Sequence, residues 1–291
     1  MTRSVEEIVR EAWGDVGFTY EPLGGGYVNF TYKVALGGRD YVLRINGDQN
    51  SHLELSRESE NDVYRRAGEM GIAPNVLPQS NAEYLITEFI DARILSREEF
   101  RKPDILATSI EVLKKIHSID NHVRKLSPFD LINRYLQGMR ALKVPVPAEL
   151  GALLAEMDVM EKRWRKDESY RRAYCHNDCY GANILNANGR LYAIDWELSG
   201  EGDIFFDLAT ISFCNAFTQE EDERLLACYF GKVEEEYRVA LYDMKYMNML
   251  REATWGLLHS GMEETPVNHG MNYLDWGMQN IQWLKEGRLH I

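Results

Sequence analysis

The sequence is poor in features that mark secreted and membrane-spanning proteins. Its 291 residues include four cysteines, Cys175, Cys179, Cys214 and Cys228. C-x3-C spacing without a second pair suits zinc badly, so we expect reduced thiols that are mostly packed. No apolar run reaches the roughly eighteen residues of a membrane span, and the start MTRSVEEIVREAW carries acidic residues where a signal peptide has an apolar segment. These absences predict a soluble, cytoplasmic protein without a membrane partner.

Excess positive charge is also missing. The chain has 33 Lys and Arg against 46 Asp and Glu, which gives a formal net charge of −13. A protein that binds the backbone of a nucleic acid usually carries a basic face, so we expect no nucleic-acid partner. A small cationic substrate fits this charge better. A polyphosphate ligand would need divalent cations to offset the acidic surroundings.

Strand-like runs dominate the first part of the chain, from residue 18 to about residue 90. Gly37-Gly38 lies between two of these runs and predicts a hairpin turn. One helix interrupts them at about residues 51–70, and Gly71 marks its end. This part is expected to form a sheet with one helix.

Helical periodicity dominates after residue 91, except for two short strand-like runs, ILN and LYAID, around the turn Asn188-Gly189. We therefore expect an α+β fold of two lobes. Residues 1–91 would form one lobe with an antiparallel sheet and one helix, and residues 92–291 a mainly helical second lobe. The junction between the lobes is the expected ligand site.

A glycine run, Gly24-Gly25-Gly26, lies between two strand-like runs of the first lobe. Glycines let backbone N–H groups approach phosphate oxygens closely. A Rossmann loop is disfavoured because a strand rather than a helix follows, and a Walker loop is excluded because no G-K-[ST] follows. Two interpretations remain, a flexible hairpin and a loop that covers nucleotide phosphates as in kinases.

A kinase-like phosphate loop requires a cation on the next strand and an acid on the following helix. The strand YVLRI supplies Arg44, and the helix supplies Glu60, with Glu54 and Glu58 as alternatives. Kinases use Lys at the strand position, and Arg differs from Lys in reach and shape. The other interpretation of Arg44 is a strand side chain that extends to solvent.

The stretch YCHNDCYGANILNANGRLYAIDWE contains His176, Asp178, Asn183 and Asp195 between short apolar runs. Each of these side chains is costly to bury without a partner. Their concentration in one stretch therefore predicts a functional site.

Four motifs give the chain a family resemblance: LGGGYVNFTYKV, HNDCYGANIL, AIDWE and REATWGLL. Their order and spacing resemble the choline/ethanolamine kinase group of the aminoglycoside phosphotransferase-like superfamily, whose fold is that of the protein kinases. Arg44 departs from the Lys of kinases, and Val28 stands where the group often has Thr. The resemblance implies an ATP- and Mg²⁺-dependent kinase, with residues 1–91 as the nucleotide-binding lobe and residues 92–291 as the catalytic and substrate lobe.

The resemblance also assigns roles to single residues. Asp178 would orient the substrate hydroxyl and accept its proton, and Asn183 and Asp195 would bind Mg²⁺. Residues expected at the nucleotide are Gly24, Gly25, Gly26, Asn29, Arg44, Glu60, Glu88 and Ile90, the last two through backbone contacts with adenine.

Three further polar residues near these motifs have structural interpretations. We expect His176 to pack and hydrogen-bond so that it holds the catalytic loop. Glu197 would either orient a neighbouring side chain or begin a solvated turn. Asp207 would either cap a helix or brace the catalytic loop, and capping is the simpler account.

Aromatic residues near acids suggest a cationic alcohol as the substrate. The expected contacts are Tyr180, Trp255, Glu252 and Trp276, besides Asp178. Aromatic faces and carboxylates suit the quaternary ammonium of choline, whereas the same aromatic stripe on a helix could simply be core. Ethanolamine follows closely, and antibiotics, thiamine, sugars and homoserine are more distant alternatives. A nucleotide-binding protein without catalysis is the alternative of a different class.

Overall fold

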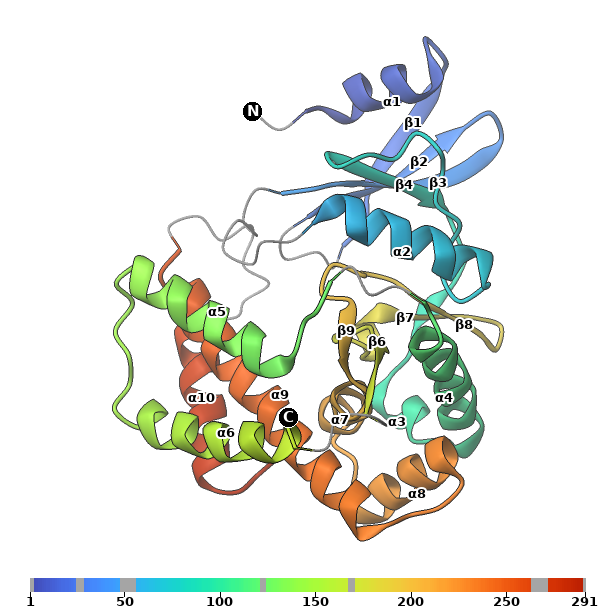
Figure 1. Ribbon diagram of the computed structural model, residues 1–291. Coiled ribbons are helices and arrows are strands. Elements are labelled where there is room, and N and C mark those ends of the chain that lie inside the picture. The colour runs from blue at the N-terminus through green and yellow to red at the C-terminus, as the bar shows by residue number, and fades with distance from the viewer. Residues whose placement is uncertain are drawn as a thin grey trace.

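The structure, a computed structural model, describes residues 3–24, 29–47, 56–120, 124–166, 171–262 and 272–289. A four-stranded antiparallel sheet with helices forms the N-terminal lobe, and a mainly helical lobe follows it (Figure 1). This arrangement confirms the α+β, two-lobed fold expected from the sequence. Within the described residues, no helix is long and apolar enough to cross a membrane.

The sheet of the N-terminal lobe has the strand order β1-β2-β3-β4. Gly37 and Gly38 both have positive φ, 60° and 77°, and connect β2 to β3 in the register Leu36↔Arg39. Glycine adopts this region of φ without steric cost, so the predicted hairpin turn is confirmed. The strands are β1 (Phe18–Pro22), β2 (Phe30–Leu36), β3 (Arg39–Ile45) and β4 (Tyr84–Glu88).

The same lobe contains helix α1 (Val5–Trp13), which the strand-based interpretation of this region did not include. Ser4 and Glu7 form a capping box at its start, a pattern that is visible in the sequence as S-x-x-E. Val5, Ile8 and Val9 of α1 are buried against the apolar side chains of the sheet. The helix therefore completes the core of this lobe.

Helix α2 (Arg57–Glu69) is the helix expected from the sequence, and Gly71 follows its end with φ +69°. Residues 51–55 of the expected helix lie outside the described part of the chain. Val63, Tyr64 and Ala67 are buried and join the core of the second lobe. Helix α2 therefore packs against the second lobe.

The second lobe is organised around helix α9, which has 26 residues and packs against α5, α7 and α10. Almost all of its middle is buried, which explains why its sequence lacks a strong polar face. The helices of this lobe are α3 (Arg97–Phe100), α4 (Pro103–His117), α5 (Pro128–Ala141), α6 (Leu150–Trp164), α7 (Ile204–Cys214), α8 (Gln219–Phe230), α9 (Glu235–Ser260) and α10 (Tyr273–Lys285).

Short strands hold the polar stretch in place. Strands β7 and β8 join through Asn188 and Gly189, whose φ values are 53° and 92°, which confirms the predicted turn. Two additional pairings, β5 with β7 and β6 with β9, fix the remaining edges. The strands are β5 (Arg93–Ile94), β6 (Arg172–Cys175), β7 (Ile184–Ala187), β8 (Arg190–Ala193) and β9 (Gly200–Asp203), and a 3-10 helix, η2 (Gly181–Asn183), precedes β7.

All four cysteines are free thiols. Cys175 and Cys179 are buried, and Cys214 and Cys228 are partly buried. The expectation of reduced, mostly packed thiols is therefore confirmed.

Candidate active site

The carboxylate of Asp178, just after β6, is held from two sides. Its Oδ2 atom accepts a hydrogen bond from Asn183 Nδ2 at 2.9 Å, and its Oδ1 atom accepts one from Arg251 Nη1 at 3.0 Å. Arg251 comes from α9 and also donates to the backbone carbonyl of Asn177 at 2.9 Å. Asn177 itself has φ +62°, an uncommon conformation for a residue other than glycine. These hydrogen bonds give the Asp178 carboxylate a defined orientation.

Asp207, on α7, braces the loop that carries Asp178. Its Oδ2 atom accepts the backbone N–H of His176 at 2.9 Å, and its Oδ1 atom accepts that of Asn177 at 2.7 Å. Helix α7 is capped instead by Asp203, whose Oδ1 atom accepts from the backbone N–H of Phe205 at 2.8 Å. Of the two interpretations of Asp207, the structure supports the brace.

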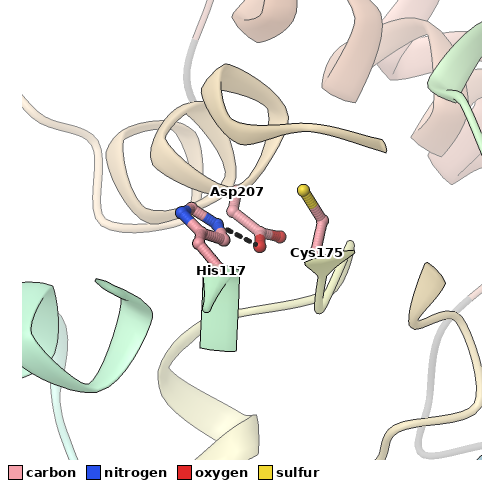
Figure 2. Close-up of side chains that lie close together, drawn as sticks. All are labelled: His117, Cys175 and Asp207. Atoms are coloured by element: carbon pink, nitrogen blue, oxygen red, sulfur yellow. Dashed lines mark hydrogen bonds and ion pairs between the residues drawn. The ribbon is translucent and has the colours of Figure 1, made fainter. Parts of the chain in front are cut away.

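Figure 2 shows how the brace is itself supported, with His117 directed at Asp207 and Cys175 beside them. His117 Nε2 lies 3.1 Å from Asp207 Oδ2, and His117 Nδ1 lies 2.6 Å from the hydroxyl of Tyr229. Burial raises the pKa of the Cys175 thiol well above its ordinary value. His, Cys and Asp are possible metal ligands. Here, however, both Asp207 oxygens already accept loop N–H groups, which makes the group a structural brace.

His176 is fully buried, with its ring centroid 4.8 Å from that of Trp196. Its Nε2 atom lies 3.0 Å from the carbonyl oxygen of Ile194. Burial lowers the pKa of His176, although the charges of Asp207 and Asp178 oppose this shift. The side chain ties the loop that carries Asp178 to the segment after β8, which supports the expected packing role of His176.

Asn183 and Asp195, the predicted metal ligands, lie on neighbouring segments because Ile194 N–H donates to the carbonyl oxygen of Asn183 at 3.0 Å. Asn183 uses its Nδ2 atom for Asp178, so its Oδ1 atom is the one left for a cation. Asp195 has φ +65°, a strained backbone conformation of the kind that concentrates at functional sites.

The surroundings of Asp195 favour a bound cation. Although 40% of its side chain is exposed, its Oδ1 atom is buried and, among the described residues, accepts no hydrogen bond. Burial, together with the charge of Glu197, raises the pKa of Asp195 well above its ordinary value. A carboxylate and an amide oxygen are donors that suit Mg²⁺, so these residues fit that ion.

Arg44 and Glu60 form the predicted pair between β3 and α2, with Arg44 Nη2 2.6 Å from Glu60 Oε1. Both side chains are almost completely buried, which contradicts the solvent-directed interpretation of Arg44. Arg44 Nη1 also lies 3.6 Å from Asp195 Oδ1. Glu58 is exposed, and Glu54 lies outside the described residues, so Glu60 is the partner that the structure shows.

Burial disfavours the charged form of both Arg44 and Glu60, and their neighbours reverse this effect. Burial alone would lower the pKa of Arg44, but the charges of Glu60 and Asp195 raise that pKa above its ordinary value. It would raise the pKa of Glu60, but Arg44 and Arg57 keep that pKa below its ordinary value. Both side chains therefore stay charged.

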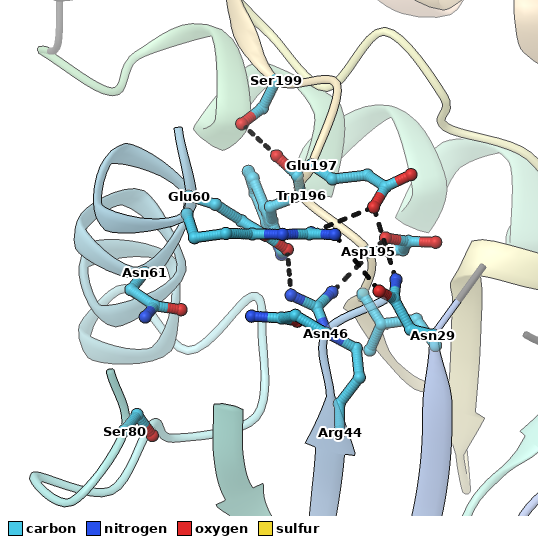
Figure 3. Close-up of polar contacts among 12 residues, drawn as sticks. Asn29, Arg44, Asn46, Glu60, Asn61, Ser80, Asp195, Trp196, Glu197 and Ser199 are labelled. Carbon is cyan, nitrogen blue, oxygen red and sulfur yellow. Dashed lines mark hydrogen bonds and ion pairs between the residues drawn. The ribbon is translucent and has the colours of Figure 1, made fainter. Parts of the chain in front are cut away.

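Arg57, at the first turn of α2, is a site residue that sequence analysis missed. Its Nη1 atom lies 2.9 Å from Glu60 Oε2 and 3.1 Å from Glu197 Oε2, and its Nη2 atom donates to Asn29 Oδ1 at 3.2 Å. Asn29 Nδ2 in turn donates to Glu197 Oε2 at 3.3 Å. The charges alternate from Asp195 through Arg44, Glu60 and Arg57 to Glu197, and Figure 3 shows Arg44, Glu60, Asp195 and Glu197 gathered there. Glu197 thus orients its neighbours rather than beginning a solvated turn.

The glycine loop is only partly described. Gly24 precedes the gap, whereas Gly25, Gly26 and Val28 lie outside the described residues. Asn29, at the end of this loop, accepts a hydrogen bond from the backbone N–H of Gly47 at 3.3 Å. Contacts of the loop with phosphate stay a prediction.

Glu88 and Ile90 lie where β4 leads into the second lobe. The backbone N–H of Glu88 donates to the carbonyl oxygen of Asn75 at 3.0 Å, and Glu88 Oε1 accepts from Asn75 Nδ2 at 2.9 Å. These bonds fix the end of the strand. The expected backbone contacts with adenine stay a prediction.

Two of the expected substrate residues, Glu252 and Trp276, are in direct contact. Trp276 Nε1 donates to Glu252 Oε2 at 3.1 Å, and Arg251 Nη2 donates to Glu252 Oε1 at 2.9 Å. Arg251 therefore links Asp178, the expected base, to the expected substrate residue Glu252, a connection that sequence analysis also missed.

Tyr180, another expected substrate residue, lies near the same carboxylates. Burial, followed by the negative charges of Asp178 and other nearby groups, raises the pKa of Tyr180.

Trp255, the fourth expected substrate residue, is partly buried one turn further along α9. Its ring lies 5.3 Å from that of Tyr273 in a T-shaped arrangement and 4.4 Å from that of His259. It also packs against the main core. Trp255 therefore has a structural role whether or not it contacts substrate.

Comparison with known proteins identifies the family of the chain. Residues 19–242, most of its length, match the phosphotransferase enzyme family. The chain belongs to this family. The match includes the glycine loop, the Arg44–Glu60 pair and the loop from His176 to Asp195 of the phosphotransferase.

Individual relatives agree with this assignment. The phosphotransferase is 26% identical to Protein LicA of Haemophilus influenzae over 269 residues, which cover 88% of this chain and 76% of LicA. It is similar to a solved choline/ethanolamine kinase family protein from Mesorhizobium loti, with a TM-score of 0.77, 26% identity and coverage of 98% and 97% of the two chains. Choline kinase LicA from Streptococcus pneumoniae shares the fold, with a TM-score of 0.80, 22% identity and the same coverage. The phosphotransferase is a small-molecule kinase.

Proposed function

We propose that this phosphotransferase transfers the γ-phosphoryl group of ATP to the hydroxyl of a small amino alcohol, and that choline is the preferred acceptor. The products would be phosphocholine and ADP. One observation carries the proposal: Asp178, Asn183, Asp195 and the Arg44–Glu60 pair meet at the junction of the two lobes. Choline and ethanolamine kinases among the similar proteins support a small alcohol as the acceptor.

In this mechanism Asp178 orients the attacking hydroxyl. Asn183 and Arg251 hold its two carboxylate oxygens, so the remaining lone pairs point in defined directions. The hydroxyl donates its hydrogen bond to Asp178, and its proton passes to this carboxylate as the new O–P bond forms and the bond to ADP breaks. Positioning is the larger contribution, because a carboxylate is a weak base for an alcohol.

The nucleotide would be held from both lobes. Arg44, kept charged and oriented by Glu60, would contact phosphate oxygens. The glycine loop, which begins at Gly24 and ends at Asn29, would cover the same phosphates. Asn183 and Asp195 would hold Mg²⁺, which supplies positive charge to the phosphate oxygens. Backbone groups of Glu88 and Ile90 are the proposed contacts of adenine.

The acceptor would bind near Glu252. Tyr180 lies near the carboxylates of Asp178 and Glu252, Trp276 donates to Glu252, and Trp255 would add aromatic surface one turn further along α9. A quaternary ammonium is attracted to ring faces by about 0.5 to 2 kcal/mol for each contact. This combination of rings and acids supports choline as the acceptor.

A coupled ADP-release assay with purified protein, ATP and Mg²⁺ tests the proposal. Choline, ethanolamine, homoserine, thiamine and an aminoglycoside would be compared, with detection of the phosphate ester. We expect the highest kcat/KM with choline. Turnover of another alcohol in the absence of choline and ethanolamine turnover would refute the acceptor and leave the kinase assignment in place. ATP binding without turnover of any alcohol would favour a non-catalytic role.

A further inference from the structure

Asn46, the first residue after β3, contacts the guanidinium of Arg44 at its Nε side. Asn46 Oδ1 accepts a hydrogen bond from Arg44 Nε at 3.1 Å, and both residues appear in Figure 3. The two residues are two positions apart at the end of a strand, so their side chains extend from the same face. The spacing R-x-N therefore positions an amide acceptor beside the arginine.

The amide of Asn46 is itself fixed by the segment before β4. Its Nδ2 atom donates to the carbonyl oxygen of Ala82 at 2.9 Å, and its backbone N–H donates to the carbonyl oxygen of Glu83 at 3.0 Å. A carbonyl oxygen only accepts and the Nε–H of Arg44 only donates, so these partners determine which end of the amide faces Arg44. The Oδ1 atom of Asn46 is thus directed at Nε.

The contact with Glu60 does not by itself fix the plane of the Arg44 guanidinium. Arg44 Nη2 and Glu60 Oε1 lie 2.6 Å apart, yet the described residues give neither atom a hydrogen bond. Arg44 Nη1 lies 3.6 Å from Asp195 Oδ1, which is beyond hydrogen-bond distance. Attraction between charges does not require an aligned N–H, so both contacts allow the plane to rotate. The directed bond to Asn46 limits this rotation.

We propose that Asn46 is a positioning residue for nucleotide binding, because its bond to Nε sets the plane of Arg44 and keeps Nη1 on the side of Asp195, where phosphate is expected. This inference rests on the proposed function. Lys, which kinases have at this strand position, carries a methylene group where Arg carries Nε. Arg44 and Asn46 therefore act as a unit in this chain.

The test is a double-mutant cycle on the dissociation constant of ATP, measured by calorimetric titration with Mg²⁺ and without an acceptor alcohol. The variants are Asn46→Ala, Arg44→Lys and the combination of both. Asn46→Ala should weaken ATP binding by about tenfold, the scale of one hydrogen bond to a charged group. In the Arg44→Lys background the same change should have a smaller effect, because the Nε donor is gone.

Asn61→Ala is the matched control. Asn61 Nδ2 donates to the carbonyl oxygen of Asn81 at 2.7 Å, so this variant also removes an amide bond to the segment before β4. Among the described contacts, it removes none to Arg44. Asn61→Ala should lower the melting temperature, as Asn46→Ala does, and leave ATP binding unchanged.

An equal or larger effect of Asn46→Ala in the Arg44→Lys background would refute the inference, because a purely structural role of Asn46 does not depend on Nε. Unchanged ATP binding by Asn46→Ala, or comparable weakening by Asn61→Ala, would also overturn it. If Asn46→Ala does not fold, Arg44→Lys decides alone: weaker ATP binding supports the inference, and unchanged or tighter binding contradicts it. Wild-type protein that binds no ATP would instead refute the proposed function.

Discussion

Arg251 Nη1 donates to Asp178 Oδ1 at 3.0 Å, which joins a buried cation of α9 to a carboxylate of the loop that follows β6. The two residues are 73 positions apart in the sequence. Asn183 binds the other carboxylate oxygen, so Asp178 is oriented before any substrate arrives. This preorganisation leads to the first two predictions.

Asp178→Asn should lower kcat by at least about 100-fold, because the amide cannot accept the substrate proton as a carboxylate does. ATP affinity should change little, since Asp178 faces the acceptor in the proposed mechanism. Steady-state kinetics together with calorimetric titration of ATP measure the two quantities. Near-normal turnover would show that Asp178 has another role.

Arg251→Lys should lower kcat by about tenfold to a hundredfold, with little change in KM for ATP. Lysine keeps the charge but lacks the fork that reaches Asp178 and Glu252 together, so the base loses its fixed orientation. Kinetics with each substrate varied in turn separate these parameters. A thermal melt checks folding. An unchanged kcat in a folded variant would contradict the positioning role.

Arg57→Gln and Glu197→Gln should each raise KM for ATP, and their effects should be coupled. Arg57 bridges Glu60, Glu197 and Asn29, so removal of either partner breaks the same chain of charges. We expect a coupling free energy of about 1 to 3 kcal/mol in a double-mutant cycle on ATP affinity. Additive single effects would show that the contact between Arg57 and Glu197 contributes nothing to nucleotide binding.

The stability of the protein should fall as the pH drops below about 6.5, the ordinary pKa of histidine. Burial lowers the pKa of His176 in the folded state, so below this pH the unfolded chain binds a proton that the folded chain does not. The contribution has a slope of up to about 1.4 kcal/mol per pH unit and ends at the folded pKa. Urea unfolding between pH 5 and 8 measures it. His176→Phe should reduce this slope, and an identical slope would assign it to other groups.

Several parts of the fold and site could be predicted because their causes are local. The two-glycine turn after Leu36 and the turn at Asn188-Gly189 follow from residues that accept positive φ. The pairing of Arg44 with Glu60 could be anticipated because a buried strand cation requires an acid on the adjacent helix. Asn183 and Asp195 were expected from the resemblance of their motifs to the kinase group, and the structure places them on neighbouring segments.

The sequence by itself determined the strand-rich first part, the mainly helical second part, the polar loop from His176 to Asp195 and the family, because these depend on short motifs and on residue periodicity. Only the tertiary structure decided that Asp207 braces that loop, that Arg57 meets Glu197 across 140 positions, and that Trp276 meets Glu252 across 24. Such contacts depend on how helices pack in three dimensions. A charged or aromatic side chain on a helix has many possible partners, and packing selects one of them.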